Sequence, residues 1–338
     1  MQLIQNIRDG QYFYDAGVDM AMQDYLIHHA DLDDDILFPY LSEPKVQIGR
    51  YQNTRKEVDL DYAKEHDIKI SRRDTGGGAI YIDEGSPAFC YIFKDDKLYN
   101  DYPALFAPML DVLHDLGVKG AKMSGRNDIE VDGHKISGAA MRKVGDRVHA
   151  GYSLLIDVDA ETMGRVLTPH DKKITSKGID SIRSRVLGVR PYLAPEYQDL
   201  TSQDITNLVA ERIMGVDHLS EAKRYAMTEE EWAAIDKSCE EKYLNWDWNY
   251  GADPDFGEER SEKFPGGFVS VTMEVHKGRI EKIKIQGDFF GDRAISDVEE
   301  KLVGCRVRRE DLEEALADMD LRPYLGMVSQ DELISLLI

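Results

Sequence analysis

Apolar and polar residues follow each other along this chain in two patterns, one typical of helices and one typical of strands. Helices are expected in five segments: 17–30, 59–67, 102–118, 201–215 and 228–243. In the last of these, Thr228 and Glu231 have the spacing of a capping box, in which each side chain accepts the other's backbone N–H. We therefore expect that helix to begin just after Thr228.

Strand patterns fill most of the chain between these helices. They cover the segments 35–41, 45–51, 68–74, 79–83, 87–93, 127–138 and 149–159. The first two are joined through Glu43-Pro44, which is consistent with a hairpin or a sheet edge. Asp132-Gly133 lies inside 127–138 and is the strongest short signal for a hairpin turn. Strands and helices mixed in this way predict an α+β fold.

The composition changes at 245–267, NWDWNYGADPDFGEERSEKFPGG, which is rich in aromatic residues, glycine, proline and acid. Such a stretch is typical of a connecting arm. Segments 268–275 and 279–287 beyond it predict two strands with a Lys-Gly turn, and three helical patterns follow. We therefore expect a large N-terminal α+β domain at 1–245, and at 246–338 the arm and a small C-terminal α+β domain.

The composition of the 338 residues, with 42% hydrophobic and 31% charged residues, is that of a globular protein. A net charge of −22, from 42 Lys+Arg against 64 Asp+Glu, argues against general nucleic-acid binding but permits a small anionic ligand. No apolar run is long enough for a transmembrane helix, and no secretory signal is seen. The three cysteines are too few and too scattered for a disulfide framework or a zinc site. We therefore expect a cytoplasmic protein with no membrane partner.

RRDTGGGAIYID, at 72–83, places three glycines directly after a pair of arginines. Glycines let backbone N–H groups approach a ligand closely, and guanidinium groups bind phosphate or carboxylate in a bidentate manner. The pattern suits an anion at a strand end, with both Arg72 and Arg73 as its charge. A Walker A loop and a dinucleotide fingerprint are excluded, because a strand rather than a helix follows. A plain turn or bulge explains the glycines equally well.

Lys135 follows the predicted turn in SGRNDIEVDGHKISGAA, at 124–140. Regular alternation puts Lys135, Ser137 and Ala139 on one face of the strand, and Ile136 and Gly138 on the other. The small residues after Lys135 leave room for a ligand against the strand. A lysine there neutralises charge on a carboxylate and an α-phosphate during nucleotidyl transfer. A solvated surface lysine is the alternative.

Several spaced blocks, in order, resemble the signature blocks of the lipoate–protein ligases. They are GRYQN at 49–53, RRDTGGGAIYID at 72–83, SGRNDI at 124–129, KISGAA at 135–140 and KGIDSIRSRV at 177–186. NWDWNYG and the C-terminal part also resemble the long form with its accessory domain, so the likeness covers nearly the whole chain. One departure is Ile82-Asp83, where the family often has His-Asp.

The resemblance implies a mixed sheet flanked by helices, as in the biotin ligases, and a reaction that joins lipoate to a protein through lipoyl-adenylate, with ATP and Mg²⁺. The acceptor would be an apo lipoyl domain of a 2-oxoacid dehydrogenase complex or the glycine-cleavage H protein. Lys135 matches the lysine that touches lipoate and nucleotide, and Asp128 is a candidate Mg²⁺ ligand. The remaining residues implied for nucleotide binding are Arg73, Gly76, Gly77, Gly78, Ala79, Ile80, Tyr81, Asn127 and Gly138.

Two other functions remain open. An acyltransferase of the same fold would move octanoyl or lipoyl groups between carrier domains without ATP, through a cysteine thioester. Cys90 is the only cysteine in the N-terminal half of the chain, and its apolar strand PAFCYIF predicts burial. A non-catalytic protein that binds lipoate or a lipoyl domain is the second alternative.

Overall fold

The structure is a computed structural model that describes residues 1–8, 10–15, 17–167, 185–251 and 257–338. The chain divides into two compact units. The first consists of Met1–Gln47, Val58–Ser71 and Ile80–Asn245, and the second of Ile48–Glu57, Arg72–Ala79 and Trp246–Ile338. The second unit thus combines the C-terminal part with two short segments from the N-terminal half. A catalytic domain that ends at 245 stays a prediction.

A seven-stranded mixed sheet is the centre of the first unit. Its strands are, in spatial order, β1 (Gln2–Leu3), β4 (Ile36–Tyr40), β8 (Ala88–Phe93), β12 (Arg147–Leu154), β11 (His134–Val144), β10 (Asp128–Val131) and β9 (Lys122–Ser124). Neighbouring strands are antiparallel, except that β1 runs parallel to β4. The predicted turn at Asp132-Gly133 joins β10 to β11.

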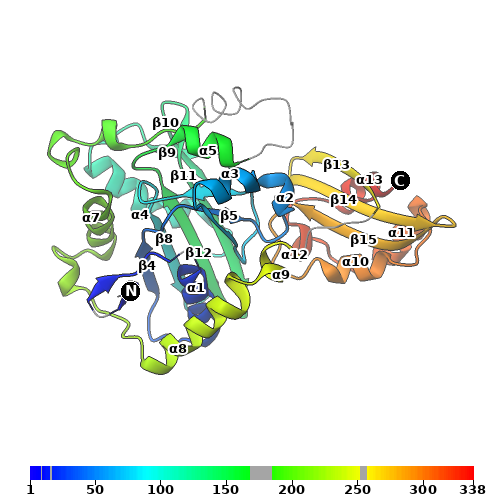
Figure 1. Ribbon diagram of the computed structural model, residues 1–338, viewed down its shortest axis with the longest axis horizontal. Helices are drawn as coiled ribbons and strands as arrows, with labels where there is room; N and C mark the ends of the chain where they lie inside the picture. Colours follow the sequence, from blue (N-terminus) through cyan, green and yellow to red (C-terminus); the bar gives the residue numbers. More distant parts are fainter. Residues whose placement is uncertain (9, 16, 168–184, 252–256) are drawn as a thin grey trace. The chain divides into compact units, whose positions relative to one another are not determined.

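Helices cover both faces of this sheet (Figure 1). Phe89, Tyr91 and Phe93 of β8 pack into one core with α4 (Tyr102–Asp115) and α7 (Ser202–Met214). The alternate residues Cys90 and Ile92 are also buried, and on their face α1 (Val18–His29) contacts β8 and β12. A strand that is buried on both faces is continuously apolar, which explains the sequence of β8.

Apart from a small second sheet, the first unit has several further elements. They are β2 (Ile7–Arg8), β3 (Gln11–Tyr12), α3 (Leu60–Glu65), α5 (Ala160–Val166), η1 (Arg190–Tyr192), η2 (Pro195–Tyr197), η3 (Leu219–Glu221), α8 (Glu229–Ser238) and the π-helix η4 (Cys239–Tyr243). The capping box of Thr228 and Glu231 at the start of α8 is confirmed.

A second, three-stranded sheet has the order β6 (Lys69–Arg72), β5 (Lys45–Ile48), β7 (Ile80–Ile82). The expectation of a hairpin or a sheet edge for 35–41 and 45–51 is therefore wrong, because β4 and β5 belong to different sheets and each lies between two other strands. All five residues of β4 are buried, as in a central strand, and β1 and β8 take both of its edges. The segment around Glu43-Pro44 connects β4 of the large sheet to β5 of the small sheet.

An antiparallel sheet of β13 (Glu258–Phe264), β14 (Gly267–His276) and β15 (Arg279–Gly287) forms the centre of the second unit. Its helices are α2 (Thr54–Glu57), α9 (Trp246–Asn249), α10 (Ser296–Leu302), α11 (Arg309–Leu316), α12 (Arg322–Leu325) and α13 (Gln330–Leu337). Lys277 and Gly278 join β14 to β15 with positive φ angles of 51° and 72°, as a tight hairpin requires. The predicted Lys-Gly turn is confirmed.

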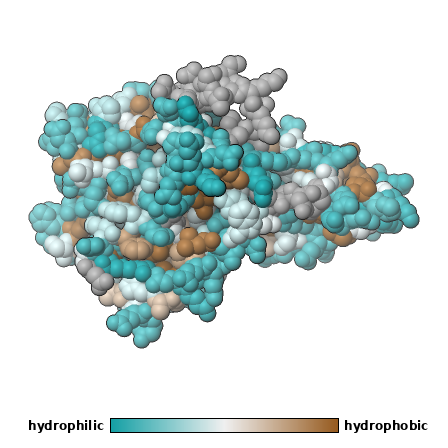
Figure 2. Space-filling model, in the orientation of Figure 1, coloured by the Kyte–Doolittle hydropathy of each residue, from teal (hydrophilic) through white to brown (hydrophobic). Residues whose placement is uncertain are grey.

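Strand β13 corrects the interpretation of 245–267 as an arm without regular structure. The residues of β13 are exposed except Phe264, which is half-buried, so the apolar alternation that marks a strand is absent. Pairing with β14 forms the strand nevertheless. Polar side chains also cover most of the face seen in Figure 2, as expected for a net charge of −22. No described helix is long and apolar enough to cross a bilayer.

Candidate functional site

Lys135 lies on β11 next to a β-bulge. Asp128 pairs with Gly138 and Ile129 with Ser137, but Glu130 pairs with Lys135, so Ile136 is an extra residue in β11. A bulge of this kind interrupts the alternation of faces. Ile136 and Ser137 are both buried, whereas Lys135 and Gly138 are half-buried. The expected alternation, with Lys135 and Ser137 on one face and Gly138 on the other, is wrong for this reason.

The bulge brings Lys135, Asp128 and Gly138 together. The Lys135 Nζ atom lies 2.8 Å from Asp128 Oδ1, and the two side chains are 41% and 36% exposed. A Cβ atom added to Gly138 would lie 2.6 Å from Lys135 Nζ and 2.7 Å from its Cε. The lysine side chain thus lies over Gly138 in the space that any other residue would fill. Glycine at this position allows Lys135 to reach Asp128.

Backbone contacts hold both sides of this cluster. Asn127 Nδ2 donates to the carbonyl oxygen of Ala139 at 2.6 Å, so its amide fixes β11. The backbone N–H of Lys135 donates to the carbonyl oxygen of Arg185 at 2.7 Å, and the segment after Arg185 runs beside Lys135. Of the block KGIDSIRSRV, residues 177–184 lie outside the described residues. Its described end thus adjoins Lys135.

Arg73 binds within the glycine loop, residues 72–79, in the second unit. Its Nη2 donates to the carbonyl oxygens of Gly76 and Gly78, each at 2.8 Å, and its Nε donates to Thr75 Oγ1 at 3.0 Å. The guanidinium group is half-buried, so one side of it meets solvent. The loop therefore curls its oxygen acceptors around the Arg73 cation.

The structural reason for glycine differs among Gly76, Gly77 and Gly78. A Cβ atom on Gly76 would lie 2.2 Å from the carbonyl oxygen of Phe289, and Gly77 has a φ of 93° with the Phe290 ring beside it. Gly78 is exposed, and its missing Cβ faces open space. Close packing and backbone conformation therefore account for Gly76 and Gly77, and open access to a ligand is a feature of Gly78.

Arg72 departs from the expectation that both arginines provide charge for a ligand. Its side chain is 1% exposed, and its Nη1 donates to the carbonyl oxygens of Gly49 and Gln52, at 3.1 and 2.6 Å. Its Nη2 donates to Thr54 Oγ1 at 2.8 Å. A guanidinium group that is buried against carbonyl groups holds the chain together. Arg72 and Arg73 are adjacent and have the same side chain, so the sequence gives them the same role. They differ in burial, which the structure shows.

The strand after the loop is β7. Ala79 and Ile80 are half-buried, and Tyr81 is buried and pairs with Val46 of β5. Burial and the neighbouring Asp83 raise the pKa of Tyr81. Ile82 is buried as well.

Cys90 does not have the properties of a reactive thiol. It is buried in β8, and burial raises its pKa to about 12. A nucleophilic cysteine requires the opposite shift, because the thiolate is the reactive form. The prediction that Cys90 is buried is confirmed.

A buried ion pair near Cys90 was not identified from the sequence. Lys45 of β5 donates to Asp19 of α1, with side chains 0% and 4% exposed, and burial raises the pKa of Asp19 although Lys45 acts in the opposite direction. The only signal in the sequence is an acid inside the apolar stripe of a helix, and one residue of this kind does not identify its partner. The pair fixes α1 against the small sheet.

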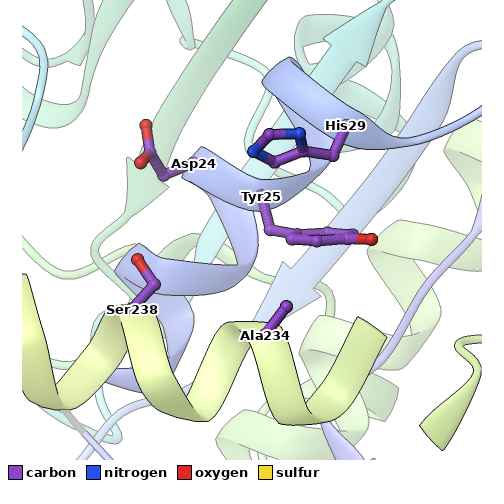
Figure 3. Close-up of a pocket in the computed structure, with 5 residues that line it drawn as sticks. All are labelled: Asp24, Tyr25, His29, Ala234 and Ser238. Atoms are coloured by element: carbon purple, nitrogen blue, oxygen red, sulfur yellow. The ribbon is translucent and has the colours of Figure 1, made fainter. Parts of the chain in front are cut away.

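A pocket of about 320 Å³ lies between α1 and α8 in the first unit. Asp24, Tyr25 and His29 line it from α1, and Ala234 and Ser238 from α8 (Figure 3). None of the predicted site residues lines this pocket.

The predicted site residues form two groups, one in each unit. Lys135, Asp128, Asn127 and Gly138 lie together on β10 and β11, and the glycine loop contains Arg73 and its three glycines. Within the described ranges, no three or more His, Cys, Asp or Glu side chains cluster as a metal site. A single carboxylate such as Asp128 still suits Mg²⁺, which proteins often hold by one or two carboxylates and the phosphates of the substrate.

Comparison with known families covers nearly the whole chain. Residues 15–214 match the lipoyl protein ligase A/B catalytic domain, and residues 253–337 match the bacterial lipoate protein ligase C-terminus. The chain is 46% identical to lipoate–protein ligase 2 of Staphylococcus aureus over 339 residues, which is 100% of both chains. It is 46% identical to lipoate–protein ligase of Streptococcus pyogenes over 333 residues, 98% of each.

Three solved structures share the fold. A bi-partite lipoate protein ligase from Thermoplasma acidophilum, studied with its E2 lipoyl domain, is 25% identical with a TM-score of 0.63, over 74% of this chain and 96% of that one. P. falciparum LipL1 in complex with lipoate is 20% identical with a TM-score of 0.78, over 99% and 97%. Lipoate–protein ligase A bound with ATP is 23% identical with a TM-score of 0.58, over 74% and 98%.

The last two structures bear on the fold alone, and they agree with the predicted mixed sheet flanked by helices. The resemblance found in the sequence blocks is confirmed by the family matches and by relatives that are similar from end to end. The chain therefore belongs to one family of enzymes, the lipoate–protein ligases.

Proposed function

We propose that this lipoate–protein ligase works in two steps. In the first, a carboxylate oxygen of lipoate attacks the α-phosphate of ATP, which forms lipoyl-adenylate and releases pyrophosphate. In the second, the amine of an acceptor lysine attacks the acyl carbon, an amide bond forms, and AMP leaves. The observation that carries the proposal is the Lys135 ammonium group, which is 41% exposed on a bulged strand beside small residues.

Charge repulsion between two anions is the main obstacle in the first step. A cation beside both groups lowers the barrier, because it stabilises charge that develops in the transition state. We assign this role to Lys135, which must then exchange its contact with Asp128 for one with the substrate. Arg73 and the glycine loop hold the phosphates in this proposal, together with Ala79, Ile80 and Tyr81.

Asn127 and Gly138 also belong to the nucleotide site in this proposal, and both support Lys135. The amide of Asn127 fixes β11, and Gly138 leaves space for the lysine side chain. Asp128 is the residue that would hold Mg²⁺, and the ion would neutralise phosphate charge when bound.

The acceptor that we propose is an apo lipoyl domain of a 2-oxoacid dehydrogenase complex or the glycine-cleavage H protein. The Thermoplasma relative was studied with its E2 lipoyl domain, which supports the first of these. A thioester acyltransferase is disfavoured, because a thiol with a pKa of about 12 is protonated at neutral pH.

The experiment is a transfer assay with the full chain, ATP, Mg²⁺, lipoate and an apo lipoyl domain. We expect pyrophosphate release and an acceptor whose mass increases by one lipoyl group. An acceptor with its target lysine replaced by arginine is the control. Equal modification without ATP, from an octanoyl carrier donor, would contradict the proposal. A chain that binds lipoate but modifies nothing would be a binding protein.

A further inference from the structure

The backbone of Arg72 is held by the segment that leads to the C-terminal part of the chain. Its N–H donates to Asn249 Oδ1 at 2.8 Å, and its carbonyl oxygen accepts from Trp248 Nε1 at 2.8 Å. In a wider sheet, a neighbouring strand would satisfy backbone groups such as these at a strand end. Here the side chains of Trp248 and Asn249 in α9 satisfy these backbone groups.

The side chain of Arg72 ends at the same place. Its Nε donates to the carbonyl oxygen of Trp248 at 2.9 Å, and its Nη2 donates to that of Asn249 at 3.0 Å. Asn249 itself is 3% exposed. Buried hydrogen bonds to a charged group are among the stronger ones in proteins, so Arg72 and α9 form one fixed cluster.

The glycine loop begins at this cluster. Arg73, the next residue, donates its backbone N–H to the carbonyl oxygen of Ile48 at 2.9 Å, and Thr75 accepts from the N–H of Arg50 at 2.9 Å. A Cβ atom on Gly49 would lie 1.9 Å from the carbonyl oxygen of Gly77, so the two backbones are in contact. A shift of Arg72 therefore moves Arg73 and the glycines with it.

We propose that Asn249 is a positioning residue for the nucleotide. It fixes the Arg72 backbone, and through Arg72 it sets the place from which Arg73 and the loop meet the phosphates of ATP. This inference rests on the proposed function, which assigns the nucleotide to the glycine loop. Misplacement by about 1 Å from a distant change can lower a rate about a hundred-fold, so a residue that touches no substrate matters here.

Two substitutions at Asn249 separate positioning from simple folding. Asn249→Leu is similar in size but removes the oxygen that accepts the Arg72 N–H, whereas Asn249→Asp keeps an oxygen there. We expect Asn249→Leu to raise the KM for ATP about ten-fold in pyrophosphate release, since a buried donor loses its partner. The KM for lipoate stays within about two-fold, and Asn249→Asp recovers most of the affinity for ATP.

Leu316→Ala is the matched control for loss of stability. Leu316 is fully buried in α11, in the core of the same unit, and its replacement lowers the melting temperature through a cavity. We expect it to leave the KM for ATP unchanged. The inference is overturned if Leu316→Ala raises that KM as much as Asn249→Leu does, or if Asn249→Asp is as impaired as Asn249→Leu.

Arg73→Ala distinguishes failure of the inference from failure of the proposed function. If Arg73→Ala raises the KM for ATP and Asn249→Leu does not, only the role of Asn249 is overturned. If Arg73→Ala has no effect either, the glycine loop is not the nucleotide site and both proposals fall. An increase with both variants, and not with Leu316→Ala, supports both.

Discussion

Replacing Gly138 with alanine moves one functional group and leaves the fold intact. The new Cβ would lie 2.7 Å from Lys135 Cε and 2.6 Å from Nζ, and 3.3 Å from Asp128 Oδ1. Carbon atoms in contact are separated by about 3.5–4.0 Å, so the end of the lysine side chain must move by about 1 Å. That end is flexible, and the strand itself need not shift.

Gly138→Ala is expected to raise the stability of the fold and to lower the rate of the reaction. Gly138 is not among the glycines with positive φ, so alanine fits its backbone and limits the unfolded chain, which stabilises the fold by about 0.4–1 kcal/mol. The reaction, in contrast, needs the ammonium group in place. A displacement of about 1 Å lowers kcat by about ten- to a hundred-fold.

The assay is ATP-dependent lipoylation of an apo lipoyl domain, with a thermal melt of each variant. We expect Gly138→Ala to be slow with an unchanged or higher melting temperature. In the Lys135→Ala background, which itself loses most activity, it should cost nothing more, because both changes act through one group. Gly120→Ala, at an exposed glycine beside Val131, is the matched control. Full activity of Gly138→Ala, or an equal loss in the Lys135→Ala background, would refute the reasoning.

Three further predictions concern buried and titrating groups. Cys90→Ser should keep ATP-dependent transfer, and a folded but inactive variant would instead favour a thioester mechanism. Lys45→Met should lower the free energy of unfolding by about 3–5 kcal/mol in urea denaturation, because the Asp19 carboxyl loses its buried cation, and adding Asp19→Leu should recover part of this loss. A hydrogen bond to Asp24 raises the pKa of His28 above its ordinary 6.5, so protonated His28 stabilises the fold below about pH 6.5, and this contribution is lost as the pH rises through the raised pKa. His28→Asn should therefore destabilise at pH 5.5 and have little effect at pH 8.5, and equal destabilisation at both would contradict the assignment.

Sequence patterns predicted most of the long helices and strands, but they did not predict which strands pair with each other. The hairpin at Asp132-Gly133, the capping box at Thr228 and the strand β8 follow from residues that are close in sequence. Whether β4 pairs with β5 depends on strands far along the chain, and local pattern carries no such information. The pattern therefore predicted the longer strands of the mixed sheet without their order, and it missed the short strands β1 and β9.

The candidate site shows the same limit on a smaller scale. The sequence proposes Lys135 and Arg73 as site residues, and this stays a prediction, but one extra residue at Ile136 reverses the expected faces of the strand. Arg72 and Arg73 are chemically identical, and only the tertiary structure buries the first. The sequence suggests that Gly76 gives clearance to a ligand, but the carbonyl group of Phe289 lies against it.

The second unit has a consequence for the way the chain is made. Tyr51, 6% exposed, stacks on Phe289 with ring centroids 4.8 Å apart, and its hydroxyl donates to the carbonyl oxygen of Arg293 at 2.9 Å. The ribosome makes Tyr51 early and Phe289 late. At roughly 5–20 residues per second, the 238 residues from 52 to 289 take about 12–48 s to synthesise. Tyr51 and the glycine loop lack these partners throughout that interval, so the second unit can complete its fold only after Phe289 and Arg293 have been made.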